Sequence, residues 1–322
     1  MRILVAPLNW GLGHASRCVP LIKRLQADGH EVVLGGNGES LTLLRKHFPM
    51  LAVLPLAPLE LQYGKGKRQV FAMLRALPKI IRSAWQDNRM LSEYMRYEQF
   101  DQVISDNRFG LYSGKTHCIY MTHQLVVALP HPWQWLEPLA ARWHRRIIRH
   151  YNECWIPDES VSADGRQGLA GRLAHPDKLP ANAKYIGVLS RFAGKDCKSD
   201  KTYTVVAVLS GLEPQRTMLE KIIIRRYENT DDTVLIVRGK MQGPPTVVKN
   251  RNITMVPWLD DSHLVACLTG AERIICRSGY SSVMDMYALG VMRKVEWHPT
   301  PGQPEQEYLA KYLNNMAQNP QT

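Results

Sequence analysis

The sequence predicts an α/β protein of two Rossmann-like, doubly wound domains. Short apolar runs alternate with helical patterns, which is the rhythm of βαβ units in an open parallel sheet. A polar, irregular stretch at residues 188–202 interrupts this rhythm, which then restarts. The 322 residues also exceed the ~250–300 at which one hydrophobic core stops growing. We therefore expect an N-terminal domain at 1–187, a linker at 188–202 and a C-terminal domain at 203–322.

The first domain opens with a strand, a glycine-containing loop and a helix. Residues 2–6 are apolar, residues 7–14 contain the loop, and the apolar residues of 19–25 recur at helical spacing. A second strand is expected at 31–34. Further strands of this domain are expected at 52–54, 102–104, 116–121 and 153–156.

The second domain repeats the pattern. Strands are expected at 203–209, 233–237, 253–256 and 273–276, and helices at 215–227, 261–268 and 280–289. Two such domains in tandem face one another across a cleft. Ligands of such sheets bind outside the carboxyl ends of the strands, so we expect the chemistry in that cleft.

The chain is basic, with 41 Lys and Arg against 29 Asp and Glu and a formal net charge of +12. Such a surplus favours anionic partners, which include nucleic acid, a membrane surface and phosphorylated ligands. No RNA-binding aromatic signature, zinc finger or helix-turn-helix pattern is present, so nucleic acid is not an expected partner.

Cysteines and apolar segments limit the class of protein further. The six cysteines include no C-x-x-C pair, which argues against a zinc site or a redox pair and favours buried reduced thiols. No segment approaches the ~20 apolar residues of a spanning helix, and no signal peptide precedes the first strand. We expect a cytoplasmic protein that contacts a membrane only peripherally.

The first candidate site is the loop at 9–14. Gly11 and Gly13 let the backbone approach a ligand closely, and a helix N-terminus favours negative charge there. The third glycine of a dinucleotide fingerprint would fall at Ser16, and no Walker motif is present. His14 could accept a proton as a general base, or it could only cap the helix.

The second candidate site lies between the strand at 273–276 and the helix at 280–289. Backbone N–H groups at Gly279–Ser281 and the hydroxyls of nearby serines would converge on an anion such as a diphosphate. The hydroxyl groups belong to Ser278, Ser281 and Ser282. An ordinary Ser-rich N-cap would look the same.

Three further places carry polar side chains at strand or helix ends. Glu305 and Gln306 could contact sugar hydroxyls or could form a plain capping sequence. Asp106 and His123 each end a strand of the first domain on the side that faces the cleft. Either could contact an acceptor or could be a satisfied polar group of its loop.

Together these segments resemble the donor site of the family 28-like glycosyltransferases of the GT-B fold. The best-known member of that family is the lipid-intermediate N-acetylglucosaminyltransferase of peptidoglycan synthesis. The resemblance is carried by Cys276-Arg277-Ser278-Gly279 with Asp285 and Ala288-Leu289-Gly290, by Gly11-Leu12-Gly13-His14, by Gly211 and Arg216, by Trp258-Leu259-Asp260-Asp261, and by Glu305-Gln306.

The resemblance implies an inverting glycosyltransferase that needs neither metal nor cofactor. A hexose or N-acetylhexosamine would pass from a nucleotide-diphosphate sugar, with UDP favoured, to a cell-envelope or lipid-linked acceptor. His14 would be the base, Asp285 would bind the ribose, and Gln306 would contact the sugar. The donor-binding residues would be Gly211, Arg216, Gly239, Trp258, Leu259, Arg277, Ser278, Gly279, Tyr280, Ser281, Ser282, Asp285, Glu305 and Gln306; the acceptor-side residues would be Gly11, Gly13, Asp106 and His123.

The sequence departs from the family pattern at four places. The first glycine loop is less glycine-rich and carries Trp10, Asp285 replaces the usual glutamate, and Glu305 stands where an amide is expected. The chain also ends soon after Tyr312, so that we expect no full closing C-terminal helix. Two other functions stay open. One is a sugar-nucleotide epimerase of the same architecture, and the other is a basic protein that binds nucleic acid or sugar nucleotides without catalysis.

Two segments concentrate positive charge in the first domain. One includes Lys65, Lys67, Arg68, Arg75, Lys79 and Arg82. The other places Arg142, Arg145, Arg146 and Arg149 at helical spacing after Trp133 and Trp135. A basic amphipathic helix with tryptophans can rest on an anionic bilayer. The alternative is a solvated helix face whose apolar side covers the core.

Overall fold

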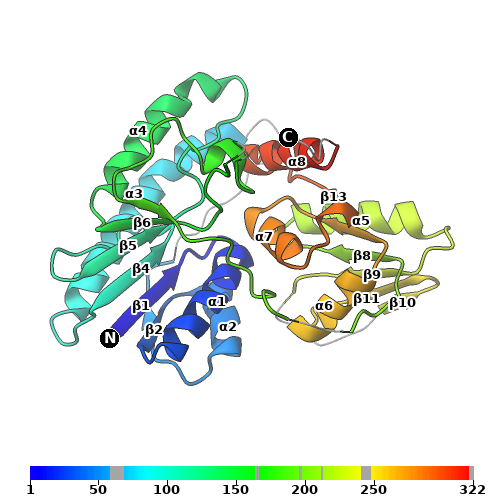
Figure 1. Ribbon diagram of the computed structural model, residues 1–322, viewed down its shortest axis with the longest axis horizontal. Coiled ribbons are helices and arrows are strands. Elements are labelled where there is room, and N and C mark those ends of the chain that lie inside the picture. Colours follow the sequence, from blue (N-terminus) through cyan, green and yellow to red (C-terminus); the bar gives the residue numbers. More distant parts are fainter. Residues whose placement is uncertain are drawn as a thin grey trace. The chain divides into compact units, whose positions relative to one another are not determined.

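The computed structural model describes residues 1–58, 69–163, 165, 167–195, 198–211, 213–240 and 248–318 (Figure 1). Backbone contacts divide the chain into two compact units. Unit 1 contains Met1–Leu189 and Pro301–Tyr308, and unit 2 contains Ser190–Thr300 and the chain from Leu309 onward. We had assigned 301–308 to the C-terminal domain, whereas these residues pack with unit 1.

Unit 1 is built on a seven-stranded sheet in the order β3-β2-β1-β4-β5-β6-β7, and every adjacent pair is parallel. The apolar runs form its central strands because helices cover both faces of such a sheet. The strands are β1 (Arg2–Pro7), β2 (Glu31–Gly36), β3 (Val53–Pro55), β4 (Gln102–Asp106), β5 (His117–Met121), β6 (Glu153–Ile156) and β7 (Ala183–Tyr185).

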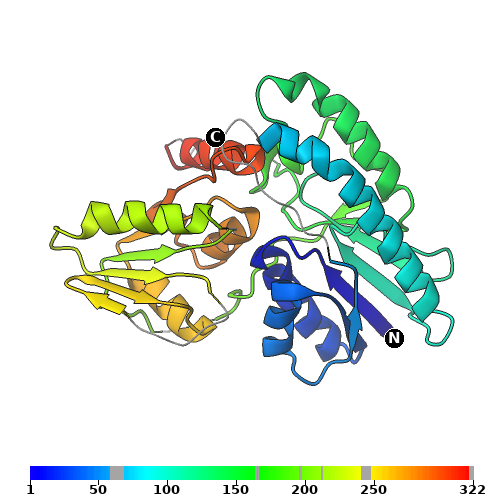
Figure 2. The same ribbon diagram turned by 180° about the vertical axis from the view of Figure 1, so that it is seen from behind.

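Helices cover both faces of this sheet (Figures 1 and 2). Helices α1 (Leu12–Ala27) and α2 (Gly38–His47) lie on one face, and α3 (Gln69–Tyr94) and α4 (Glu137–Ile148) lie on the other. Helix α1 begins at Leu12, so Gly13 and His14 lie in its first turn rather than in the loop that we expected.

The strand order of unit 1 reverses between β1 and β4. The chain adds β2 and β3 on one side of β1 and then crosses to β4 on the other side. The register pairs Pro7 with Asp106 and Asp106 with Met121, so the carboxyl ends of β1, β4 and β5 are level. Such a reversal is where open α/β sheets bind ligands.

Unit 2 has a six-stranded sheet in the order β10-β11-β9-β8-β12-β13, which is parallel except for β10. Its strands are β8 (Val205–Val208), β9 (Val234–Val237), β10 (Val248–Asn250), β11 (Ile253–Val256), β12 (Arg273–Cys276) and β13 (Val295–Trp297). Its helices are α5 (Gln215–Tyr227), α6 (Asp261–Gly270), α7 (Tyr280–Ala288) and, from Leu309 onward, α8 (Pro304–Gln318). The strand order reverses between β8 and β12.

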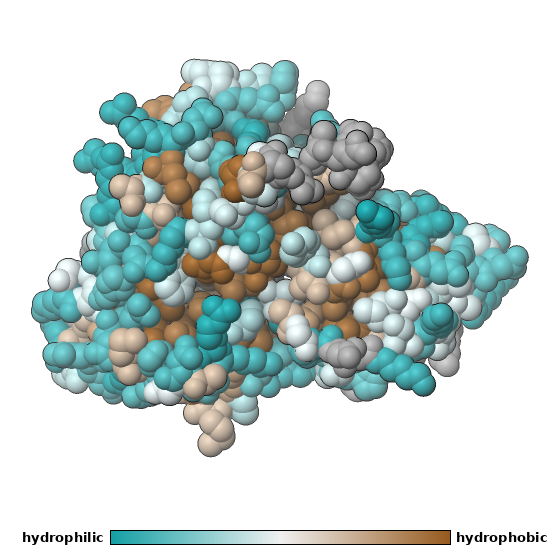
Figure 3. Space-filling view, viewed as in Figure 1, coloured by the Kyte–Doolittle hydropathy of each residue, from teal (hydrophilic) through white to brown (hydrophobic). Residues whose placement is uncertain are grey.

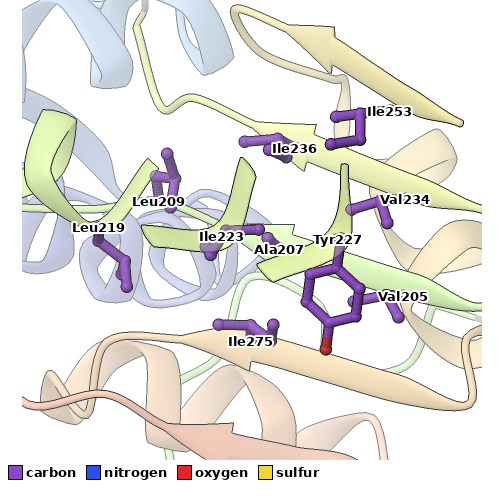
Figure 4. Packing of buried hydrophobic residues seen from close by; sticks show 10 residues of the cluster. All are labelled: Val205, Ala207, Leu209, Leu219, Ile223, Tyr227, Val234, Ile236, Ile253 and Ile275. Atoms are coloured by element: carbon purple, nitrogen blue, oxygen red, sulfur yellow. The ribbon is translucent and has the colours of Figure 1, made fainter. Parts of the chain in front are cut away.

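The core of unit 2 lies between α5 and the sheet. Leu219, Ile223 and Tyr227 follow one face of α5 and point toward the side chains of the strands (Figure 4). Their partners are Val205, Ala207, Leu209, Val234, Ile236, Ile253 and Ile275.

The predicted fold class, two doubly wound α/β units, is confirmed. The sequence analysis missed the three-residue strands β7, β10 and β13 and the helix α2. A three-residue strand is too short to show a period, so it forms only because a longer neighbour supplies its hydrogen bonds. Lys65, Lys67, Arg68 and Cys197 lie outside the described residues.

Three further properties bear on function. No helix in the described ranges is both long and apolar enough to cross a bilayer. Across the same ranges, no group of three or more His, Cys, Asp or Glu side chains is arranged to hold a metal ion. The described cysteines are buried free thiols, namely Cys18, Cys118, Cys154, Cys267 and Cys276.

Candidate active site

A buried polar cluster lies at the strand reversal of unit 1. Asp106 ends β4 and is fully buried. Arg17 Nε donates to Asp106 Oδ2 at 2.7 Å, and Arg17 Nη2 donates to the other carboxylate oxygen. His14 and Arg17 reach the same carboxylate because residues three apart share one face of a helix, and α1 starts directly after β1.

The cluster keeps Asp106 ionised. Burial alone would raise the pKa of this carboxyl, but the Arg17 guanidinium and the His14 ring outweigh it and hold the pKa well below its usual range. Arg17 is itself only 1% exposed, and its charge is balanced by the same carboxylate. Burying these two charges costs little free energy only because they form a hydrogen-bonded ion pair.

The hydrogen bond to Asp106 sets the tautomer of His14. His14 Nδ1 lies 3.1 Å from Asp106 Oδ1 and 3.0 Å from Arg17 Nη2. An ionised carboxylate is the stronger partner, so we assign the proton to Nδ1, which donates to Asp106. The other ring nitrogen, Nε2, makes no hydrogen bond with the described residues. The His14 side chain is 15% exposed, which distinguishes it from its buried partners.

His123 and Glu305 extend the cluster on the far side of Arg17. His123 follows β5 and accepts from Arg17 Nη1 through Nδ1 at 3.0 Å. Its Nε2 lies 2.8 Å from Oε1 of Glu305, which is in the first turn of α8. Burial lowers the pKa of His123 despite this neighbour. Burial opposes the ionisation of Glu305, but the hydrogen bond from His123 and the charge of Arg17 lower its pKa overall. A neutral His123 therefore donates from Nε2 to an ionised Glu305.

The structure groups the predicted residues of unit 1 differently from the sequence analysis. Asp106 and His123 are enclosed and hydrogen-bonded, so they act on His14 and Arg17 rather than being exposed for an acceptor. Glu305, predicted with the donor, packs in unit 1. Gly11 is the N-cap residue of α1 with a φ of 78°, a value that favours glycine.

Arg17 is the member that the sequence analysis missed. Its spacing from His14 was a usable signal because it places both side chains on one helix face. The carboxylate that they share is 89 residues from Arg17 along the chain, so the pairing itself had no local signal.

The second predicted site lies at the strand reversal of unit 2. Gly279 is the N-cap residue of α7, and as a glycine it has no side chain with which to cap the helix. The first N–H groups of a helix have no partner inside it, so those of Ser281 and Ser282 present a positive partial charge at this end. Ser278 is buried at the end of β12, and Ser281 and Ser282 are partly buried.

Asp285 lies one turn further along α7. Its Oδ1 accepts a hydrogen bond from Ser190 Oγ at 2.6 Å. Burial raises the pKa of Asp285 to about 6, against the opposing effects of Arg191 and Ser190. Its carboxyl group is therefore half ionised near pH 6 and mostly ionised at pH 7.

Arg277 holds loops together with most of its guanidinium. Nη1 donates to the carbonyl of Pro299 at 2.9 Å, and Nη2 donates to the carbonyl of Gln215 at 2.7 Å. Its Nε is buried and has no hydrogen-bond partner among the described residues. Nη1 also donates to the carbonyl of His298 at 3.3 Å, so the donors without a partner among the described residues are Nε–H and one N–H of Nη2. Burial lowers the pKa of the group.

Arg216 and Gly239 contact each other. Arg216 Nη1 donates to the carbonyl of Gly239 at 2.9 Å and Nε donates to Glu213 at 3.2 Å. Gly239 has a φ of 64°, and a Cβ there would meet the carbonyl oxygen of Leu209 at 2.4 Å. Backbone packing therefore explains this glycine without a ligand. Gly211 is exposed after β8, with a φ of 91°.

The other predicted donor residues lie at two helix starts. Trp258 and Leu259 are partly buried and follow β11. Next to them Asp260 caps α6 by accepting from the backbone of Ser262 and His263, each at 3.0 Å. In α8, Gln306 Nε2 donates to Gln303 Oε1 at 2.5 Å.

Comparison of the sequence with known proteins finds relatives that are named as glycosyltransferases. No family model matches the chain. Two proteins of Methanosarcina acetivorans, each named an uncharacterized glycosyltransferase, are 24% and 21% identical to it. The alignments cover 98% and 95% of this chain and 82% of each relative.

Solved structures share the fold at low identity. The calicheamicin glycosyltransferase CalG4 matches with a TM-score of 0.60 and 11% identity over 97% of this chain and 83% of its own. The spinosyn rhamnosyltransferase SpnG, solved with thymidine diphosphate, matches with a TM-score of 0.54 and 14% identity over 99% and 90%. A putative UDP-N-acetylglucosamine 2-epimerase of Listeria monocytogenes matches with a TM-score of 0.53 and 12% identity over 99% and 88%.

The sequence relatives span nearly the whole chain, and the two α/β units have the architecture of the GT-B glycosyltransferases. The chain therefore has the GT-B fold, and over nearly its whole length it is similar to proteins named as glycosyltransferases.

Proposed function

We propose that the protein is an inverting, metal-independent glycosyltransferase, family 28-like, in which unit 2 binds a nucleotide-diphosphate sugar and His14 of unit 1 is the base. The observation that carries this proposal is the His14–Asp106 pair at the strand reversal of unit 1. The donated sugar is a hexose or an N-acetylhexosamine, and its acceptor is a carbohydrate or a lipid-linked molecule.

His14 has the arrangement that a general base requires. Nδ1–H is held by the ionised Asp106, so the lone pair of Nε2 is available for the proton of an acceptor hydroxyl. The acceptor oxygen then attacks the anomeric carbon as the bond to the diphosphate breaks. The proton stays on His14, and the positive ring is stabilised by the carboxylate of Asp106.

The N-terminus of α7 is our candidate for holding the diphosphate. The backbone N–H groups of Ser281 and Ser282, their hydroxyls and the remaining donors of Arg277 all favour an anion. They would stabilise the negative charge that grows on the leaving group. Asp285 would accept hydrogen bonds from the ribose. The backbone of the segment at Trp258 and Leu259 would contact the nucleobase, and Gln306 would contact the sugar.

Nucleotide binding to the full chain tests this proposal. Titration calorimetry in EDTA is expected to show that wild type binds UDP, and that Ser281→Ala with Asp285→Ala weakens binding at least about tenfold by removing two ligand hydrogen bonds. The control is Ser199→Ala with Asp231→Ala, which removes the same residue types elsewhere in unit 2 and should change nothing. TDP is titrated in parallel, and tighter TDP binding would replace uridine by thymidine. Failure of both nucleotides to bind folded wild type would refute the donor site.

The pKa of Asp285 predicts how nucleotide binding depends on pH. Above about pH 6 the carboxylate is ionised and can accept from the ribose, and below that pH it is protonated. Affinity for a UDP-sugar, whose diphosphate has no proton to lose between pH 5 and 8, is expected to fall as the pH drops through about 6. Asp285→Asn should bind more weakly at pH 8 and show no such fall. An equal fall in both proteins would place the titrating group elsewhere.

An epimerase is the second candidate, because a structure with that name shares the fold. The two reactions differ in what happens without an acceptor. An epimerase converts or releases the sugar of the bound donor, whereas our transferase leaves it largely intact. Incubation of the protein with UDP-N-acetylglucosamine, followed by chromatography of the sugar, separates them.

We also propose that the protein acts in the cytoplasm, at the inner face of the plasma membrane. The basic surplus of the chain and its arginine-rich helix support this location.

A further inference from the structure

Asp285, our candidate for binding the ribose, is held by the segment that precedes the first strand of unit 2. We had expected a linker at residues 188–202, but the chain packs with unit 2 from Ser190 onward. Ser190 is only 2% exposed, and its Oγ donates to Asp285 Oδ1 at 2.6 Å. Because the two residues are 95 positions apart, this hydrogen bond fastens the beginning of unit 2 to α7.

The hydroxyl group of Ser190 can point its proton in one direction only. The backbone N–H of Phe192 donates to Ser190 Oγ at 3.1 Å, so the oxygen is an acceptor on that side. A serine hydroxyl carries a single proton, and the contact with Asp285 Oδ1 uses it. Phe192 is itself buried, which anchors the turn that presents the hydroxyl. Ser190 is therefore oriented toward Asp285 before any ligand binds.

The cations of the same segment are bound to another carboxylate. Lys195 Nζ donates to Asp261 Oδ2 at 3.0 Å, and Arg191 Nη1 lies 3.4 Å from Asp261 Oδ1. Asp261 is in the first turn of α6. Among the described residues, Ser190 is thus the side chain that donates a hydrogen bond to Asp285.

The two carboxylate oxygens of Asp285 therefore differ. Oδ1 is occupied by Ser190, whereas Oδ2 accepts no hydrogen bond from the described part of the chain. Asp285 is also only partly buried, although Ser190 is enclosed. Residues of apolar or intermediate hydropathy surround α7 at the surface, whereas hydrophilic residues dominate the outer end of this unit (Figure 3). Oδ2 is therefore the oxygen that a ligand at α7 would meet.

We propose that Ser190 is a positioning residue of the donor site, which occupies Oδ1 of Asp285 and leaves Oδ2 to bind a single hydroxyl group of the ribose. A carboxylate with both oxygens available can accept from the 2′ and the 3′ hydroxyl together, because these groups are neighbours on one face of the ring. With Oδ1 already paired, one of the two hydroxyls gains little from Asp285. This role of Ser190 rests on the proposed function, in which Asp285 binds the ribose of a nucleotide sugar.

Deoxy analogues of UDP measure how many ribose hydroxyls Asp285 binds. At pH 8, calorimetry of the wild-type chain is expected to show that either 2′-deoxy-UDP or 3′-deoxy-UDP binds at least about tenfold more weakly than UDP, because a hydrogen bond to a charged group is lost. The other analogue should bind within about threefold of UDP. In Ser190→Ala, Oδ1 can accept from the second hydroxyl, so both analogues should bind at least about fivefold more weakly than UDP.

The pH dependence of binding is a readout that packing alone does not move. Burial raises the pKa of Asp285 to about 6, the charge of Arg191 and the Ser190 hydrogen bond oppose this rise, and the charge of Asp261 adds to it. The other titratable group beside Asp285 is the thiol of Cys276, whose own pKa is raised by burial. Substitution of Ser190 leaves these groups in place and removes a bond to the ionised carboxylate. Ser190→Ala should therefore raise, by about one unit, the pH at which affinity for UDP-N-acetylglucosamine falls.

Two matched variants separate the hydrogen bond from packing. Ser190→Cys fills nearly the same space with a weak donor, so it should behave like Ser190→Ala in both titrations. Ser199→Ala removes a hydroxyl group of the same segment that bonds to Thr269 at 3.1 Å, and it should behave like wild type.

Three results would overturn this role of Ser190. In the first, both analogues or neither bind wild type at least about tenfold more weakly than UDP. In the second, Ser190→Ala keeps the wild-type ratios and the wild-type pH dependence. In the third, Ser190→Cys behaves like wild type while Ser190→Ala does not, which would place the effect in packing. Failure of wild type to bind UDP and TDP would refute the donor site itself, whereas these three results leave UDP binding intact.

Discussion

His14→Ala is expected to lower kcat by about 10²–10⁴-fold, the usual contribution of a positioned general base. The acceptor hydroxyl then loses the group that takes its proton in the transition state. The affinity for UDP should stay within about twofold of wild type, because His14 belongs to the buried polar cluster of unit 1 rather than to the diphosphate site. Nucleotide release from the donor, measured with a saturating acceptor, gives kcat, and calorimetry gives the UDP affinity.

A second histidine of the same unit provides the control. His117 starts β5 and is bonded to Glu153 at 3.2 Å, at the amino end of the sheet rather than the carboxyl end. His117→Ala should leave kcat unchanged. If His14→Ala retained the wild-type kcat, the base would be another group and our assignment of the His14–Asp106 pair would be wrong.

Arg17→Met is expected to destabilise the protein by about 3–5 kcal/mol at pH 7, the cost of leaving one member of a buried ion pair without its partner. Asp106 would keep its burial and lose both guanidinium bonds. Urea unfolding at pH 7 measures the loss, and the transition of unit 1 must be followed by itself because two units need not unfold together.

The sign of the pH dependence follows from the carboxyl group. In wild type the pKa of Asp106 is below its unfolded value of ~3.9, so its contribution to stability is present above that pH and is lost as the pH falls. In Arg17→Met the guanidinium is missing, so burial raises the pKa of Asp106 above its unfolded value. Folding then favours the protonated carboxyl group, and this contribution to stability is lost as the pH rises. The difference between the two proteins is therefore largest at neutral pH and shrinks toward pH 4.

A double variant and a tautomer measurement separate the role of Arg17 from simple packing. Arg17→Met with Asp106→Asn removes both charges and should recover part of the lost stability, because the stability changes of substitutions at neighbouring residues are not additive. Nitrogen-15 shifts of His14 should report a proton on Nδ1 in wild type and a mixture of tautomers in Asp106→Asn. A stability loss that is the same at pH 4 and pH 7 would contradict the ion-pair explanation.

The buried polar cluster around His14 and Asp106 illustrates which parts of a site can be predicted from a sequence. His14 follows a strand and a glycine loop, and Asp106 ends another strand, so local patterns placed both at the carboxyl edge of one sheet. Their contact depends on the register that pairs Pro7 with Asp106, which a sequence pattern does not encode. The bond between His123 and Glu305 joins residues 182 positions apart, and we had assigned them to different domains.

The surface of α4 shows the same limit for packing. The sequence predicted a helix with an arginine face and an apolar face, and α4 has both. Which apolar residues are covered depends on how much of the helix the sheet and its loops can reach. His144 and Ile148 are buried, while Leu139 remains exposed. A hydrophobic period therefore predicts that a helix is amphipathic, but not what covers it.

The sequence by itself determined the α/β class, the two-unit organisation, most central strands and the helix at 215–227, because apolar periods and glycine or polar breaks are local properties of the chain. Four features could be seen only in the tertiary structure. They are the pairing of Arg17 with Asp106, the burial of Asp106, the packing of residues 301–308 with unit 1 and the exposure of Trp135. These features depend on contacts between segments far apart in the chain, and the free energy of such contacts is set by burial and charge pairing after the sheets have formed.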